Sequence, residues 1–202
     1  MSLLFESIKV EKRKFVNISF HNERFNKSRR KLLNISEEQS LESLVTIPEE
    51  LSEEIYKCRI FYDYKIDKVE FLKYERRNVL SLKTVACDDV FYEYKYADRS
   101  KIDELKVKYA PLPEEDIIII KNGLITDTSY SNIVFFDGSK WFTPKEPLLL
   151  GTKREKLLRE GKILERQIKL TDLEDYTEFK MINAMMEFES SPSLQIDKII
   201  SI

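Results

Sequence analysis

The most constraining feature of this sequence is the stretch 123–154, in which strand patterns, turns and a helix start follow one another closely. Asp127 ends one predicted strand, and Asn132 begins the next. A predicted hairpin with its turn at Asp137-Gly138 is followed by Thr143-Pro144 and then by Gly151-Thr152-Lys153-Arg154, where a helix is expected to begin. The first N–H groups of a helix have no acceptor inside it and therefore favour an anion. The stretch predicts a unit that offers a carboxylate to a ring nitrogen and N–H groups to a phosphate.

Those two groups are the two ends of pyridoxal phosphate (PLP). The pattern Asp127-x-x-x-x-Asn132, Thr143-Pro144 and Gly151-x-x-Arg154 resembles that of the class IV aminotransferase family, the fold-type IV PLP enzymes. The family usually has Glu where Asp127 stands and often has Thr where Lys153 stands. The resemblance implies a two-lobed fold like that of D-amino-acid aminotransferase, with an N-terminal lobe shorter than is usual.

The hydrophobic pattern independently indicates an α+β protein of two lobes, which we expect to comprise residues 1–97 and 98–202. In the first lobe we predict a strand from Leu3 to Val10 and a partner strand from Phe15 to Phe20. A helix is then predicted from His21 to Leu33, and Pro48 marks a plausible start of another. Next we predict a hairpin at 56–74, a strand at 81–87 and a helix that is capped by Asp98 and runs to Tyr109. Toward the C-terminus we predict a helix at 152–160 stopped by Gly161, a strand at 163–170, a short helix capped by Asp172, and strands at 179–184 and 194–202.

The composition excludes several classes of protein. Acidic and basic residues nearly cancel to a net charge of −2, which does not indicate a nucleic acid or an anionic membrane as partner. Glu6 interrupts the only early hydrophobic run, and the longest apolar stretches are too short to span a membrane. The two cysteines, Cys58 and Cys87, are expected to be buried free thiols, and with one histidine they form no local zinc motif. We expect a cytoplasmic protein.

Lys95 is the best candidate for the lysine that PLP chemistry requires. It lies between a β-rich run and a predicted helix start, in Tyr94-Lys95-Tyr96-Ala97-Asp98-Arg99. This segment resembles the Lys-x-x-Asn/Asp-Arg arrangement of 4-amino-4-deoxychorismate lyases within the family, and the resemblance implies that Lys95 forms the Schiff base. The same resemblance implies that Asp127 contacts the pyridine nitrogen through a charge-assisted hydrogen bond.

Four further residues are expected to bind the cofactor phosphate. Arg24 lies in His21-x-x-Arg24, which resembles the His-x-x-Arg helix whose arginine grips the phosphate. Thr152 offers a backbone N–H, Lys153 offers an ammonium group, and Asn183 matches the Asn-Ala segment of the lyase subgroup. We expect His21 to have a capping or packing role rather than a catalytic one.

The resemblance implies a PLP-dependent enzyme, and its first candidate activity is the conversion of 4-amino-4-deoxychorismate to 4-aminobenzoate and pyruvate, a step toward folate. A PLP-dependent aminotransferase acting on branched-chain or D-amino acids is the alternative, and a non-catalytic protein with this fold is a further one. Arg76, Arg77 and Arg99 are candidates for binding the carboxylates of a small amino-acid-like substrate. The resemblance also implies a homodimer, and the sequence leaves these activities open.

Overall fold

The computed structural model describes residues 3–202, which form two compact units. The first unit comprises the described residues up to Glu75 together with Tyr94–Asp98, and the second comprises Arg76–Glu93 and Arg99–Ile202. Two lobes of mixed α and β structure were expected. The expected boundary after residue 97 differs from this grouping mainly in Arg76–Glu93, because the strand in that segment is hydrogen-bonded into a sheet of the second unit.

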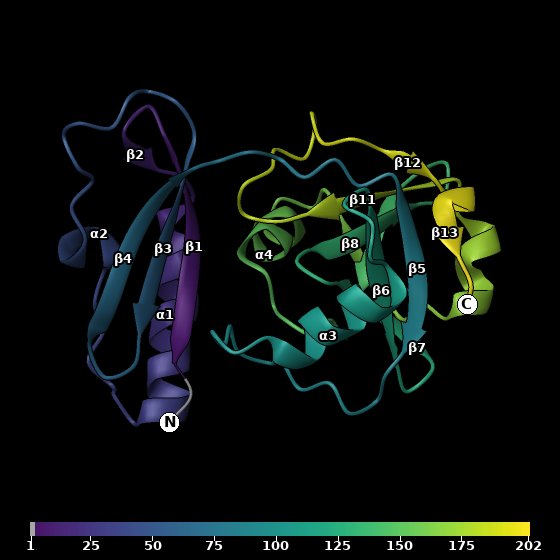
Figure 1. Ribbon diagram of the computed structural model, residues 1–202, viewed down its shortest axis with the longest axis horizontal. Helices are drawn as coiled ribbons and strands as arrows, with labels where there is room; N and C mark the ends of the chain where they lie inside the picture. Colours follow the sequence, from purple (N-terminus) through teal and green to yellow (C-terminus); the bar gives the residue numbers. More distant parts are fainter. Residues whose placement is uncertain (1–2) are drawn as a thin grey trace. The chain divides into compact units, whose positions relative to one another are not determined.

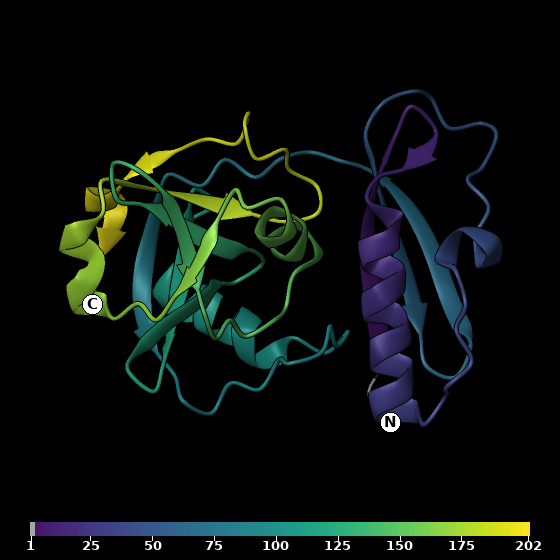
Figure 2. The ribbon, with the colours of Figure 1, turned by 180° about the vertical axis from the view of Figure 1, so that it is seen from behind.

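The first unit is a four-stranded antiparallel sheet with a long helix on one face (Figures 1 and 2). The strands follow the spatial order β2-β1-β3-β4. Apolar side chains of the sheet and of α1 form its core, as the alternation of buried residues along β3 requires. The elements are β1 (Leu4–Glu11), β2 (Lys14–Phe15), α1 (Ile18–Leu33), α2 (Leu41–Leu44), β3 (Tyr56–Tyr62) and β4 (Ile66–Lys73).

Two sequence predictions for this unit were wrong. The strand expected from Phe15 to Phe20 ends at Phe15, because Asn17 adopts a left-handed conformation (φ 56°) and α1 begins at the next residue. Left-handed geometry stops the extended chain, and asparagine tolerates it better than most residues. The helix expected near Pro48 is also absent from the described chain, in which the short helix α2 lies before it.

The segment Tyr94–Asp98 returns to the first unit and aligns beside the start of β1. The N–H of Phe5 donates to the carbonyl oxygen of Lys95 at 2.9 Å, and the N–H of Ala97 donates to that of Leu3 at 2.8 Å. Leu4 and Tyr96 form an antiparallel bridge between these two bonds. The backbone of Lys95 is therefore fixed by β1.

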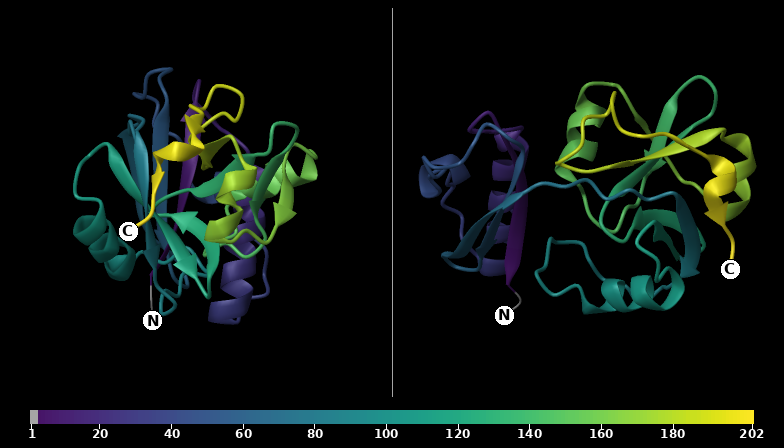
Figure 3. Two further views of the ribbon diagram at one scale, coloured as in Figure 1. Left: turned by 90° about the vertical axis from the view of Figure 1, so that its right-hand side faces the viewer. Right: turned by 45° about the horizontal axis from the view of Figure 1, so that its top comes forward.

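The second unit contains two sheets, with the orders β10-β9-β8-β11-β12 and β13-β5-β6-β7 (Figures 1 and 3). β5 and β6 are parallel, and α3 lies in the crossover that such a pair requires. The elements are β5 (Ser81–Ala86), α3 (Ser100–Tyr109), β6 (Glu115–Lys121), β7 (Leu124–Thr128), β8 (Asn132–Phe136), β9 (Trp141–Pro144), α4 (Thr152–Arg159), β10 (Leu164–Arg166), η1 (Leu170–Asp175), β11 (Glu178–Ile182), β12 (Leu194–Gln195), η2 (Ile196–Lys198) and β13 (Ile199–Ile200).

Successive residues of β8 point to two different cores. Ile133 and Phe135 belong to the larger core of the second unit, whereas Val134 packs with Leu157 of α4 and Ile182 of β11. Burying a leucine side chain contributes roughly 1.5–3 kcal/mol. This alternation fixes α4 on one face of the sheet, next to the strands that carry Asp127 and Asn132.

Most helix and strand positions agree with the sequence, and the differences lie at element ends. Arg99, not Asp98, is the N-cap of α3. The strand expected at 163–170 is reduced to Leu164–Arg166. The helix expected from Asp172 begins at Leu170, and the Asp172 carboxylate accepts the N–H of Lys169 at 2.8 Å.

Cys58 and Cys87 are free and buried, as predicted. None of the helices described between residues 3 and 202 has the length and apolar character needed to cross a membrane.

Candidate active site

Glu6, His21 and Arg24 form a buried polar cluster in the first unit, which we call the Glu6 cluster. The Glu6 carboxylate accepts hydrogen bonds from Arg24 Nε at 2.8 Å and Arg24 Nη2 at 2.5 Å. His21 Nδ1 lies 2.6 Å from the second carboxylate oxygen. His21 and Arg24 are three residues apart on α1 and therefore share the helix face that meets β1. The side chains of Glu6 and His21 are 0% and 1% exposed.

The charges of this cluster are compensated internally. Burial alone raises the pKa of Glu6, but the charge and hydrogen bonds of Arg24 and the bond to His21 lower it to about 2. Burial lowers the pKa of His21 below its ordinary value, although Glu6 opposes that shift. At neutral pH the cluster is thus a carboxylate paired with the Arg24 guanidinium, with a neutral His21 donating from Nδ1.

Lys95 belongs to the same unit as this cluster. Its Nζ lies 4.5 Å from the centre of the Phe5 ring, the neighbour of Glu6 on β1. The positive charge of Lys95 also contributes to lowering the pKa of His21. The structure therefore brings together Lys95 and Arg24, two residues that the sequence proposed for different ends of one cofactor.

In the second unit, Asp127 is a buried carboxylate held by neutral donors. Asn132 Nδ2 donates to its Oδ1 at 2.7 Å, and the N–H of Leu149 donates to its Oδ2 at 2.9 Å. Burial raises the pKa of Asp127 to about 6, although these bonds and the charge of Arg154 oppose the shift. A carboxylate has about four lone-pair sites, so each oxygen keeps capacity for another donor. A cationic ring nitrogen is a partner that this buried charge would favour.

Asn132 organises the loop before α4. Its Nδ2 also donates to the carbonyl oxygen of Leu149 at 2.9 Å, so a single amide joins β7, β8 and this loop. Gly151 packs directly against it, because a Cβ atom added there would lie 1.9 Å from Asn132 Oδ1. Asn132 therefore orients both the loop before α4 and the Asp127 carboxylate.

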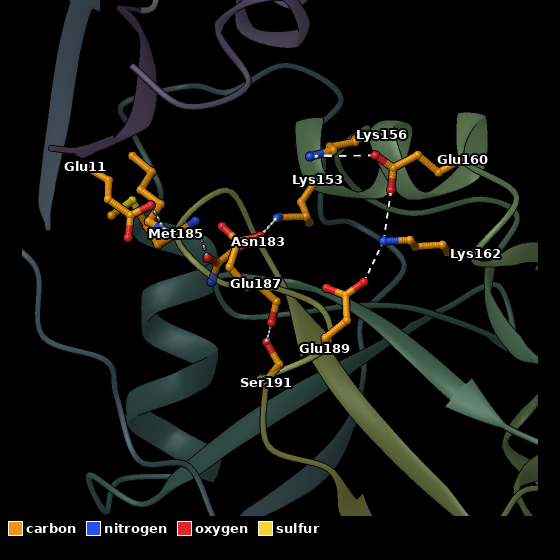
Figure 4. Close-up of polar contacts among 11 residues, drawn as sticks. Glu11, Lys153, Lys156, Glu160, Lys162, Asn183, Met185, Glu187, Glu189 and Ser191 are labelled. Carbon is orange, nitrogen blue, oxygen red and sulfur yellow. Dashed lines mark hydrogen bonds and ion pairs between the residues drawn. The ribbon is translucent and has the colours of Figure 1, made fainter. Parts of the chain in front are cut away.

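The first turn of α4 carries three buried residues, Thr152, Lys153 and Arg154. Gly151 is the N-cap of α4, and the first N–H groups of a helix favour an anion. Lys153 Nζ lies 3.1 Å from Glu187 Oε2 (Figure 4). Arg154, the arginine of the Gly-x-x-Arg pattern, points to protein groups: its Nη2 donates to the carbonyl oxygen of Pro144 and to Glu165.

Asn183 lies just after β11, also in the second unit. Its Nδ2 donates to the hydroxyl oxygen of Ser131 at 2.9 Å, and its Oδ1 accepts the N–H of Met185 at 2.9 Å (Figure 4). These bonds connect the segment after β11 with the loop that begins β8. Asp127, Thr152, Lys153 and Asn183 are thus presented by one hydrogen-bonded framework of β7, β8, α4 and the segment after β11.

The three candidate substrate arginines are all in the second unit. Arg99 donates to the carbonyl oxygen of Ser129, in the loop that follows Asp127. Arg77 lies over the Tyr130 ring, 4.6 Å from its centre. Arg76, Arg77 and Tyr130 line a pocket of about 20 Å³ with an apolar floor, which has room for about one water molecule. This pocket alone is too small for an amino-acid substrate.

Sequence reasoning missed two residues of these networks, Glu6 and Glu187. Glu6 was detectable, because its spacing of two or four residues from the core residues Leu4, Ile8 and Val10 places it on the same, inward face of β1. A charged residue at such an inward position requires a partner. Glu187 had no comparable signal, because its contact with Lys153 depends on the path of an irregular segment.

Comparison with known proteins identifies the family. The sequence profile of amino-transferase class IV matches residues 75–189, more than half of the chain. The protein belongs to the class IV aminotransferase family. Its members are PLP-dependent enzymes, which confirms the predicted family, enzyme class and cofactor.

Individual relatives agree with this assignment. The chain is 42% identical over 184 residues to an uncharacterized protein of Haemophilus influenzae, covering 90% of this chain and 97% of the relative. A crystal structure of a protein provisionally named 4-amino-4-deoxychorismate lyase, from Haemophilus somnus, is 32% identical, with a TM-score of 0.79 and coverage of 92% and 97%. The PLP-bound form of a hypothetical aminotransferase from Mycobacterium tuberculosis, 17% identical, has a TM-score of 0.76 and coverage of 96% and 80%. These likenesses confirm the predicted fold-type IV architecture.

The residues present fit PLP in the chemistry of their donors. The buried Asp127 carboxylate has neutral partners and suits a cationic ring nitrogen. The N-terminus of α4 and the Lys153 ammonium suit a phosphate dianion. Lys95 supplies the amine that an aldehyde requires.

Proposed function

We propose that this protein is a PLP-dependent lyase that converts 4-amino-4-deoxychorismate to 4-aminobenzoate and pyruvate. The observation that carries this proposal is the 32% identity to the provisionally named lyase of Haemophilus somnus, which this chain covers over 97% of its length. Solved structures of aminotransferases with this fold are 14–17% identical to this chain. The Lys95-x-x-Asp98-Arg99 and Asn183-Ala184 patterns support the same subgroup.

In this proposal the residues have the following roles. Lys95 holds the cofactor aldehyde and then, as a free amine, removes the α-proton of the substrate at its Nζ. Asp127 holds the ring nitrogen in its protonated form, and Arg24, Thr152, Lys153 and Asn183 bind the phosphate. PLP, when bound, supplies a ring that accepts electrons from the substrate α-carbon. Loss of pyruvate then makes the six-membered carbon ring of the substrate aromatic, as it is in 4-aminobenzoate.

Glu6 is a positioning residue in this scheme. Its two bonds to Arg24 fix the guanidinium plane, since a bidentate pair determines orientation as well as distance. Arg99 donates to the carbonyl oxygen of Ser129, in the loop that follows Asp127 within the second unit. Arg99 is accordingly the first candidate for a substrate carboxylate, ahead of Arg76 and Arg77.

A PLP-dependent aminotransferase acting on branched-chain or D-amino acids is the second candidate. A structure named as an amino-acid aminotransferase of Mesorhizobium loti, 15% identical, matches this chain over the full length of both, with a TM-score of 0.74. The compact N-terminal lobe is therefore compatible with either reaction. Lys95 would serve as the proton shuttle in both.

A non-catalytic role is the third candidate. Two residues depart from the family pattern in the proposed site: Asp127 stands in place of Glu, and Lys153 in place of Thr. A protein that had lost catalysis would tolerate such changes. We further propose that the protein is a homodimer and that it is located in the cytoplasm. Sedimentation at micromolar concentration tests the oligomeric state.

The test of the proposed function is release of pyruvate from 4-amino-4-deoxychorismate in the absence of any keto acid. The purified protein is incubated with PLP and substrate, and pyruvate is followed by a coupled assay. The lyase releases it, and Lys95→Ala abolishes the release. Activity that appears only when an amino acid and a keto acid are supplied together identifies the aminotransferase. A purified protein that, once unbound PLP is removed, shows no absorbance band of a lysine-bound cofactor supports the non-catalytic role.

A further inference from the structure

Lys153 is a buried ammonium group that already has a carboxylate partner. Its side chain is 3% exposed, whereas that of Glu187 is 44% exposed, and their Nζ and Oε2 atoms lie 3.1 Å apart (Figure 4). A buried charge without a partner is costly. Glu187 therefore stabilises Lys153 when the first turn of α4 holds no anion.

Glu187 is part of the segment that also presents Asn183. The Ser191 hydroxyl donates to the carbonyl oxygen of Glu187 at 2.6 Å, and Asn183 accepts the N–H of Met185 (Figure 4). The Lys153–Glu187 pair thus joins α4 to this segment, at the place where both elements are proposed to bind the cofactor phosphate. A phosphate dianion that contacted Lys153 Nζ there would compete with the Glu187 carboxylate for that ammonium group.

We propose that Lys153 exchanges its partner between Glu187 and the cofactor phosphate, and that Glu187 thereby lowers the affinity of the protein for PLP. The inference rests on the proposed phosphate site. It assigns to Glu187 the role of an internal competitor that keeps the empty site charge-balanced and is displaced when the cofactor binds. A lysine at this position thus adds to the phosphate site a charge that a hydroxyl residue does not have.

A purely structural role for the pair predicts the opposite result. If Glu187 only anchored the segment that carries Asn183, its replacement would loosen the phosphate site and weaken PLP binding. If Glu187 competes with phosphate, its replacement strengthens PLP binding. The direction of the change therefore separates the two roles.

The experiment measures binding of PLP, and separately of pyridoxal, to the apoprotein by equilibrium dialysis. Pyridoxal lacks the phosphate and reports every other contact. We expect Glu187→Gln to bind PLP about fivefold more tightly, the scale of a partly exposed charge interaction, with pyridoxal binding unchanged. Lys153→Met is expected to weaken PLP binding by about tenfold or more, in line with a charge-assisted hydrogen bond, and to make Glu187→Gln without effect in the double variant.

Glu189→Gln is the matched control, because Glu189 lies on the same segment and pairs with Lys162 rather than with Lys153 (Figure 4). The charge of Lys153 is the smallest of the influences that lower the pKa of Glu189, so Glu189→Gln is expected to change PLP affinity far less than Glu187→Gln and to leave pyridoxal affinity unchanged. PLP binding that is equal or weaker in Glu187→Gln overturns the exchange and leaves the proposed function standing. A wild-type protein that binds no PLP overturns the proposed phosphate site together with the exchange.

Discussion

Glu6 in the first unit and Asp127 in the second are both buried carboxylates among polar neighbours, and they differ in the charge of the groups that face them. Glu6 receives two bonds from the Arg24 guanidinium and one from His21, and its pKa is lowered to about 2. Asp127 receives bonds from the Asn132 amide and the Leu149 N–H, and burial raises its pKa to about 6. The burial of the two groups is alike, so the difference in pKa comes from the donors.

The comparison distinguishes a buried carboxylate that is paired with a cation of the protein from one that is held by neutral donors. Glu6 is stable as an anion within the protein alone, because its counter-charge is supplied by α1. Asp127 is well oriented by its donors, but its negative charge is not neutralised by a hydrogen-bonded cation in the described part of the chain. A site that must hold a protonated ring nitrogen benefits from such an arrangement, because the ligand then supplies the missing charge.

The largest expected effect comes from removing the ion pair between Glu6 and Arg24. We expect Glu6→Gln to lower the free energy of unfolding at pH 7 by about 3 kcal/mol, because it removes the buried carboxylate that pairs with the Arg24 guanidinium, whose side chain is only 13% exposed. The measurement is urea unfolding. Since the pKa of Glu6 is lowered in the folded state, its stabilising contribution is present above about pH 4.5 and is lost as the pH falls toward 2.

Glu54→Gln is the control for that variant. Glu54 also forms an ion pair in the first unit, with Lys73 at 2.6 Å, but both side chains are more than half exposed. Exposed pairs contribute little, so this variant is expected to unfold with nearly wild-type stability. Equal losses for the two variants would contradict the idea that burial makes the Glu6 pair strong.

The next largest effect tests how Gly151 and Asn132 hold the Asp127 carboxylate in place. Gly151→Ala places a methyl group against Asn132 Oδ1, and Asn132 cannot turn away without losing its bonds to Asp127 and Leu149. We expect a loss of about 2 kcal/mol in the free energy of unfolding, the cost of overpacking a fixed site, and weaker PLP binding. Gly151 has a φ of −72°, so an alanine meets no backbone strain.

A double variant shows whether the clash acts through Asn132. In the background of Asn132→Ala the space is open, and Gly151→Ala is then expected to cost much less, which a double-mutant cycle of unfolding energies measures. Additive losses would place the clash elsewhere and would weaken the link between Gly151 and Asp127.

The smallest expected effect is the pH dependence of Asp127. A raised pKa means that the folded state takes up a proton more readily than the unfolded chain, so stability contributed by this group increases as the pH falls through 6. Between pH 7 and pH 5, Asp127 is expected to add about 1 kcal/mol to the unfolding free energy of the cofactor-free protein. The same scan on Asp127→Asn should lack this increment, and bound PLP should remove it from the wild type.

The sequence predicted the fold well where local signals are strong. Gly161, with φ +67°, lies where the end of the helix was expected. The strand expected at Phe15–Phe20 was too long because Asn17 adopts a left-handed conformation, which a pattern of strand-forming residues does not reveal. Paired strands far apart in sequence, such as β5 and β13, had no local signal at all.

The candidate site was predictable as a set of residue types but not as a set of contacts. Spacing and family resemblance indicated Lys95, Asp127 and the first turn of α4, and these residues remain predictions as cofactor ligands. Spacing does not reveal that Arg24 and Lys153 each face a glutamate, because those carboxylates come from other parts of the chain. Pair formation across a fold is a tertiary property.

The central place of β5 in its sheet bears on how the chain is made. Leu82 of β5 pairs with Asp116 of β6 on one side and with Ile199 of β13 on the other. On the ribosome, where residues are added at about 5–20 per second, β5 emerges well before β13. Until β13 is synthesised, one edge of β5 stays open, and open edges recruit strands from other chains. Nascent copies translated from one messenger RNA are therefore the neighbours against which this sheet most needs protection.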